Sequence, residues 1–106
     1  MNNQTPWYLK QSPLGKGYQH FSSTAKQKSV LDNKTKELIR LAIASVFRCT
    51  HCTEHHIADA LKEGATKAEI SEALLLASLQ AAGTQLNWNK ELFEKYLTEA
   101  KEEAHE

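Results

Sequence analysis

The residues best suited to chemistry lie close together, because both cysteines of this 106-residue chain and three of its five histidines fall within eight positions. They are Cys49, His51, Cys52, His55 and His56. Two residues separate Cys49 from Cys52, and this spacing lets the two sulfurs meet, so that one can attack a substrate and the other can resolve the product as a disulfide. The stretch therefore predicts a cysteine pair that cycles between dithiol and disulfide.

The reactivity of this pair depends on the thiolate, since a free thiol with a pKa of about 8.5 is mostly protonated at neutral pH. Three features favour a lower thiol pKa. A helix that begins at the cysteines would direct unpaired N–H groups and a partial positive charge at them. His56 follows Cys52 by four residues and would lie on the same helical face. His51 lies between the two cysteines.

The length and composition predict one globular domain, with 41% hydrophobic and 25% charged residues. Thirteen basic residues balance thirteen acidic ones, which argues against binding nucleic acid or an anionic membrane through bulk charge. No apolar run approaches the roughly 20 residues of a membrane span, and the first residues do not resemble a secretory signal. We therefore expect a cytoplasmic protein, in which two close cysteines are more often catalytic or metal-binding than structural.

The elements that position the cysteines are predicted to be helices, since we find no strand pattern. Two prolines and two glycines in residues 1–20 predict an extended N-terminal strap. Residues 21–106 are expected to form a single all-α domain. The helices are predicted over about 22–30, over 33–48 after a cap at Asp32 or Asn33, from Thr50 or Cys52 to Glu63, from Thr66 onwards, and after a cap at Asn89.

Local signals mark several helix ends. Gly64 fits the position just past a helix, where a positive φ is needed. Thr66 and Glu69 have the spacing of a capping box. The helix after Thr66 is apolar on all sides over residues 73–79, which indicates an oligomer interface; the alternative is a central helix that its own chain surrounds.

The chain resembles the alkylhydroperoxidase D-like (carboxymuconolactone decarboxylase) family over about residues 30–87. Four motifs carry the resemblance: Leu31–Ile39 leading into an apolar helix, Cys49–Cys52 with His56 four residues later, Ala60–Thr66, and Glu69–Leu74. The resemblance implies an all-α helical bundle of the alkylhydroperoxidase D type, with the cysteine motif at a helix N-terminus. It also implies that oligomerisation completes the bundle, commonly as a trimer or hexamer.

The resemblance implies a role for each site residue. Glu37 lies twelve residues before Cys49 and would orient His56. His56 would draw the proton from Cys52, which would attack a peroxide oxygen and become a sulfenic acid. Cys49 would condense with that sulfenic acid to give the disulfide and water, and His51 would assist the proton transfer.

The implied activity is that of a thiol-dependent peroxidase, or disulfide oxidoreductase, that reduces alkyl hydroperoxides. It would need no metal and no cofactor besides its redox-active disulfide. The implied partners are a hydroperoxide substrate, an external dithiol reductant for which a lipoyl-type dithiol is the candidate, and further copies of the chain.

The sequence leaves open how Glu37 contacts His56. In a straight antiparallel hairpin the two residues would be offset by roughly 9 Å along the axis, at 1.5 Å per residue. Either the two helices cross steeply, or a water bridges the side chains, or the pairing differs.

Two alternative functions stay open. Cys49, Cys52 and His55 or His56 could be zinc ligands in a structural or non-catalytic module. The fourth ligand would come from His51, His20, His105 or another chain. Family members that lack the cysteine pair resemble lactone decarboxylases, so a lyase is the other alternative. The cysteine pair places this chain with the redox members.

Overall fold

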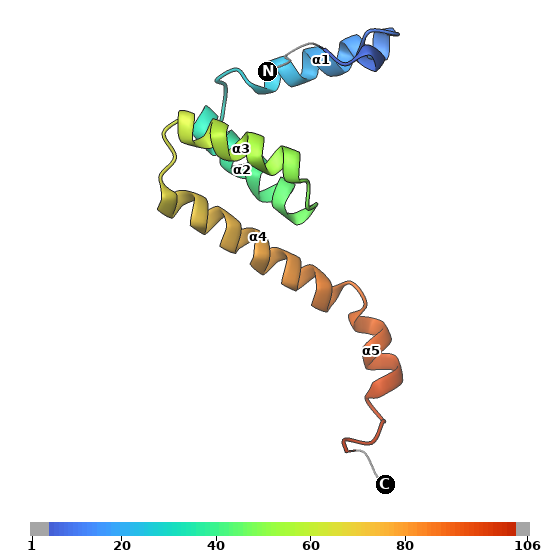
Figure 1. Cartoon of the computed structure of the whole chain (residues 1–106). Helices are drawn as coiled ribbons and strands as arrows, with labels where there is room; N and C mark the ends of the chain where they lie inside the picture. Colours follow the sequence, from blue (N-terminus) through green and yellow to red (C-terminus); the bar gives the residue numbers. More distant parts are fainter. Residues whose placement is uncertain (1–4, 104–106) are drawn as a thin grey trace.

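The computed structural model describes residues 5–103, and every regular element within that range is helical. In chain order the elements are the 3₁₀ turn η1 (Trp7–Leu9) and the helices α1 (Pro13–Ala25), α2 (Asn33–Val46), α3 (Thr50–Lys62), α4 (Lys67–Asn87) and α5 (Lys90–Leu97), as Figure 1 shows. The predicted all-α class is confirmed. None of these helices is both long and apolar enough to cross a lipid bilayer.

The packed part of the chain is built around α2, which contacts α3 on one side and α4 on another. In Figure 1, α2 and α3 run side by side, and α4 packs against α2. The buried residues of α2 are Glu37, Leu41 and Ala44, at helical spacing along one face. Leu41 of α2 and Ala60 of α3 have no exposed surface. This face therefore carries one carboxylate into the small core between α2 and α3.

Hydrogen bonds at the predicted caps fix where α2 and α4 begin. The carboxylate of Asp32 accepts a bond from the Thr35 amide at 2.8 Å. The capping box is confirmed, because the Glu69 amide donates to Thr66 Oγ1 at 3.0 Å and the Thr66 amide donates to Glu69 Oε1 at 2.8 Å. Lys34 Nζ reaches Glu69 Oε2 at 2.9 Å and joins the two helix starts. This bond lowers the pKa of Glu69 and raises the pKa of Lys34.

The N-terminal region differs from the predicted strap. Residues 13–20 are part of α1, and α1 ends at Ala25, so the separate helix expected over 22–30 is also wrong. Pro13 occupies the first turn of α1, where its missing N–H costs nothing. Gly15 lies against η1, and a Cβ there would stand 2.3 Å from the Leu9 carbonyl oxygen. The helix α1 therefore accommodates Pro13 and Gly15, and Gly15 permits the close contact between α1 and Leu9 of η1. Residues 1–4 of the strap lie outside the described range, as do residues 104–106, which include His105.

The N-cap of α5 is Asn89, as predicted, but this cap does not use its side chain. The side chain of Asn89 makes no capping bond; its backbone carbonyl accepts the amide of Leu92 at 3.0 Å. Trp88 and Phe93, which flank this turn, are both exposed.

The chain is too extended to bury its apolar surface alone. Its radius of gyration is 20.4 Å, compared with about 13 Å for a compact domain of this length. Figure 1 shows α5 leading away from the α2–α3 pair, beyond the end of α4. The exposed fractions of Leu75, Leu76 and Leu79 on α4 are 66%, 60% and 70%. The chain itself therefore does not surround α4, contrary to the second alternative considered for that helix.

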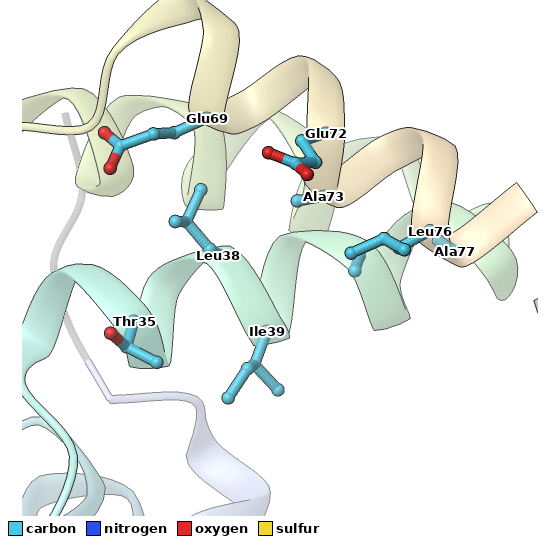
Figure 2. Close-up of a pocket in the computed structure, with 9 residues that line it drawn as sticks. Thr35, Leu38, Ile39, Glu69, Glu72, Ala73, Leu76 and Ala77 are labelled. Atoms are coloured by element: carbon cyan, nitrogen blue, oxygen red, sulfur yellow. The ribbon is translucent and has the colours of Figure 1, made fainter.

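An open apolar hollow of about 450 Å³ lies between α2 and α4, and Figure 2 shows Leu38 of α2 directed into it towards α4. Glu69 and Glu72 lie on the α4 side of this hollow. Neither cysteine lines it, so it positions no residue of the predicted site.

Candidate active site

The turn between α2 and α3 places Cys49 at the ends of both helices. The Cys49 amide donates to the Ala44 carbonyl at 3.1 Å, and the Arg48 amide donates to the Ser45 carbonyl at 3.1 Å. These two bonds form a Schellman motif, in which the residue after the C-cap takes a left-handed conformation. Arg48 has this conformation, with φ of 57°. The end of α2 therefore sets the direction in which Cys49 enters α3.

Cys49 is also the N-cap of α3. Its Sγ accepts a bond from the Cys52 amide at 3.2 Å. The two sulfurs are joined in a disulfide, with Cα atoms 5.2 Å apart. The predicted meeting of the sulfurs at a helix N-terminus is confirmed. In the reduced protein the same amide and the partial positive charge of the helix end would favour a thiolate here.

Glu37 and His56 form a direct buried pair. Glu37 Oε1 lies 2.7 Å from His56 Nδ1, and the exposed fractions of the two residues are 8% and 6%. The contact that the sequence left open is therefore direct and lies within the α2–α3 packing. When Nδ1–H donates to the carboxylate, Nε2 keeps its lone pair and can accept a thiol proton.

His56 and both cysteines line one hollow of about 340 Å³. Its lining residues are Arg40, Ile43, Ala44, Phe47, Cys49, Cys52 and His56. The end of α2 and its C-cap Phe47 supply one part of the wall, and the N-cap and first half of α3 supply the reactive groups. The arrangement can therefore hold a small apolar molecule beside a cysteine pair and a buried carboxylate–imidazole pair, which suits nucleophilic catalysis with proton transfer.

The other two histidines of the motif lie outside this hollow. His51 is exposed in the first turn of α3 and is not part of the hollow's lining, so its assistance in proton transfer stays a prediction. His55 is half-exposed, and its Nε2 lies 3.1 Å from Asp59 Oδ2.

His55, His56 and Asp59 form a cluster whose ligand atoms lie within 4.8 Å of one another, close enough to hold a metal ion. The zinc site considered from the sequence would instead use both sulfurs, which are bonded to each other here. That site would therefore require the reduced protein.

The structure reveals one residue in the hollow that the sequence did not single out. Arg40 lines the hollow with the cysteines, whereas Arg48, the cation nearest to them in sequence, lines a separate hollow that contains neither cysteine. The available signal was spacing, because Arg40 follows Glu37 by three residues and so lies on a neighbouring position of the same helix.

The left-handed conformation of Arg48 leads to a stability prediction. Replacing Arg48 by glycine should raise the free energy of unfolding by about 0.5–1 kcal/mol, because glycine adopts this conformation without steric cost. Denaturant titration of the two proteins measures the change. The comparison is Gly17→Ala, because Gly17 lies in α1 and its φ is not positive. A less stable protein after Arg48→Gly would contradict the turn described here.

Residues 13–95 match the carboxymuconolactone decarboxylase family. A protein known as uncharacterized protein 4 in the cox locus of Paracoccus denitrificans is 45% identical over 53 residues, and the match covers 50% of this chain and 48% of that protein. The aligned part of the chain thus spans about half the length of this curated relative.

Two crystal structures are similar to this one. A protein from Methanobacterium thermoautotrophicum superposes with a TM-score of 0.71 at 30% identity, covering 81% of this chain and 98% of that one. A carboxymuconolactone decarboxylase family protein from Thermotoga maritima, with a suggested part in an antioxidative response, superposes with a TM-score of 0.58 at 30% identity. The match covers 79% of this chain and 97% of that one.

Proposed function

This chain belongs to the carboxymuconolactone decarboxylase family, and on that premise we propose that it is a thiol-dependent peroxidase that reduces organic hydroperoxides. One observation carries the proposal: the disulfide-bonded Cys49 and Cys52 share a hollow with His56, whose imidazole the buried carboxylate of Glu37 holds. Paired sulfurs at a helix N-terminus suit redox chemistry, whereas a lactone decarboxylase would not need them. The suggested antioxidative part of the Thermotoga maritima relative supports the same activity.

The first half of the cycle oxidises the protein. His56 Nε2 takes the proton of the Cys52 thiol, and Glu37 stabilises the imidazolium that forms. The Cys52 thiolate attacks the terminal oxygen of the hydroperoxide R–O–OH, the O–O bond breaks, and Cys52 becomes a sulfenic acid. The leaving alkoxide takes the proton from His56 and departs as the alcohol R–OH.

The resolving step forms the disulfide. The Cys49 thiol attacks the sulfenic sulfur of Cys52, the S–S bond forms, and the sulfenic oxygen leaves as water with the thiol proton. An external dithiol then reduces the disulfide by exchange and becomes a disulfide itself. The sum is one hydroperoxide and one dithiol converted to one alcohol, one water and one disulfide.

A lipoyl-type dithiol is the candidate reductant. Such a dithiol closes a ring when oxidised, so it can reduce the protein disulfide through a short-lived mixed disulfide. A cycle of this kind needs a compartment whose thiols are kept reduced, and we therefore propose a cytoplasmic location.

The test is an assay of the purified chain with cumene hydroperoxide and dihydrolipoamide. Hydroperoxide and dithiol should disappear in a one-to-one ratio. Titratable protein thiols should fall from two to none on adding peroxide and return to two with dithiol. Peroxide loss no faster than that of a variant with both cysteines changed to serine would refute the proposal.

We also propose that the chain self-associates, as a trimer or hexamer by analogy with the family. The exposed leucines of α4 and the large radius of gyration support this. Sedimentation equilibrium should show an oligomer at micromolar concentration. Leu75→Glu combined with Leu79→Glu should dissociate it, whereas Ser71→Glu, an exposed polar position of the same helix, should not. A wild-type chain that sediments as a folded monomer would contradict the proposal.

A further inference from the structure

We propose that Arg40 makes the cysteine hollow selective for hydroperoxides that carry a carboxylate. The inference rests on the proposed peroxidase function and names the substrate class for the same site. It concerns binding only, because the guanidinium takes no part in breaking the O–O bond.

Arg40 is a cation without a partner of opposite charge in the part of the chain that the structure describes. The ion pairs within residues 5–103 join Lys34 to Glu69, His55 to Asp59 and His56 to Glu37, so no carboxylate there lies within 4.0 Å of the guanidinium. The residue is nevertheless half-buried and lines the hollow. An arginine held at a hollow in this way is available to an anionic ligand.

The carboxylate on α2 does not neutralise it. Glu37 lies one turn before Arg40, but its Oε1 holds His56, and the residue lines a different, polar hollow. Glu37 and Arg40 therefore line two separate hollows, although they are neighbours on α2.

The rest of the wall is apolar and leads from Arg40 to the sulfurs. Ile43, Ala44 and Phe47 follow Arg40 at intervals of three, four and seven residues, which is one face of α2. At 1.5 Å per residue, Arg40 and Phe47 are separated by roughly 10 Å along the helix. The sulfurs lie at the Phe47 end, because Cys49 follows that residue by two positions. The hollow thus fits a short apolar molecule with its anion at one end and its peroxide at the other.

A carboxylate is the anion that this geometry favours. The planar guanidinium can bind both oxygens of a carboxylate through parallel N–H donors. The chain has a net charge of zero, so the attraction comes from this residue and not from a general positive field. The carboxylate is unchanged by the reaction; it fixes the orientation in which the terminal peroxide oxygen meets the Cys52 thiolate.

The experiment compares 4-carboxycumene hydroperoxide with its methyl ester, which differ in charge and little in size. The full-length chain is first reduced, and its oxidation by each compound is followed by stopped flow, so that the reductant is absent from the measured step. The variants are Arg40→Met, which keeps the length of the side chain, Arg40→Lys, which keeps the charge, and the control Arg48→Met.

We expect the wild-type chain to oxidise with the acid about tenfold faster than with the ester, since a charge-assisted hydrogen bond contributes roughly one factor of ten or more. Arg40→Met should bring that ratio to about one, Arg40→Lys should give an intermediate ratio, and Arg48→Met should keep the wild-type ratio. The unreactive 4-isopropylbenzoate should inhibit the wild type competitively and Arg40→Met at least fivefold more weakly.

Two results would overturn the inference while leaving the proposed peroxidase intact. One is equal rates with acid and ester in the wild type. The other is a charge preference that appears only in the reductive half, as faster reduction by dihydrolipoate than by dihydrolipoamide, which would assign Arg40 to the reductant. Failure of the wild type to be oxidised by either hydroperoxide would refute the peroxidase proposal, and the substrate assignment with it.

Discussion

Replacing Cys52 by serine is expected to lower the rate of hydroperoxide reduction at least about 10³-fold, to the level of the uncatalysed reaction. A serine hydroxyl is not ionised near neutral pH and cannot form a sulfenic acid or a disulfide. The measurement is dithiol-dependent loss of cumene hydroperoxide, with circular dichroism to show that the helices are retained. Undiminished peroxidase activity in this variant would refute the cycle proposed above.

Cys49→Ser is the matched variant, because it removes the resolving sulfur and keeps the attacking one. It should still consume one equivalent of hydroperoxide in a single turnover and leave a sulfenic acid on Cys52 that dimedone traps. The Sγ of Cys49 also accepts a bond from the Cys52 amide at the start of α3, and this bond would favour a Cys49 thiolate if Cys49 were the attacking residue. Dimedone labelling of Cys52→Ser in place of Cys49→Ser would show that Cys49 is the attacking residue.

The second large effect is expected at the buried pair. Glu37→Gln and His56→Ala should each lower the rate of oxidation by hydroperoxide about 10²-fold, the size of a typical general acid–base contribution. Glutamine keeps the shape of Glu37 and can still accept the bond from Nδ1, but it does not stabilise the imidazolium. The rates come from stopped-flow oxidation of the reduced variants.

A double variant separates positioning from direct action. Glu37 acts through His56 and lines a different hollow from the sulfurs. Adding Glu37→Gln to His56→Ala should therefore slow the reaction no further, although each single change does. Additive losses would mean that the carboxylate reaches the reacting atoms by another route.

The parts that were predictable from the sequence follow short-range rules. The capping box at Thr66 and Glu69 depends on residues three positions apart, and its two bonds are present. The positive φ of Gly64, at 91°, follows from its place just past α3. The meeting of the two sulfurs depends only on a two-residue gap at a helix start.

The parts that were not predictable depend on how the helices pack. The direct contact of Glu37 with His56 joins residues nineteen positions apart, and sequence spacing alone left it open. Spacing alone also did not predict which arginine shares the hollow with the cysteines. After the Schellman turn Arg48 lines a separate hollow, whereas Arg40, on the face of α2, lines the hollow of the cysteines. The predicted strap is wrong over residues 13–20 because its chain-breaking residues also fit a helix. Pro13 fits the first turn of α1, and Gly15 allows the close contact with Leu9.

The most direct test of the central claim is the pH dependence of alkylation of each cysteine in the reduced protein. The amide and partial charge at the α3 N-terminus, together with His56 in the same hollow as the cysteines, should lower the pKa of one thiol, and His56→Ala should raise it again. If both thiols titrate like free cysteine, at about 8.5, and the His56 variant changes neither, then the proposed activation of the cysteine pair is wrong.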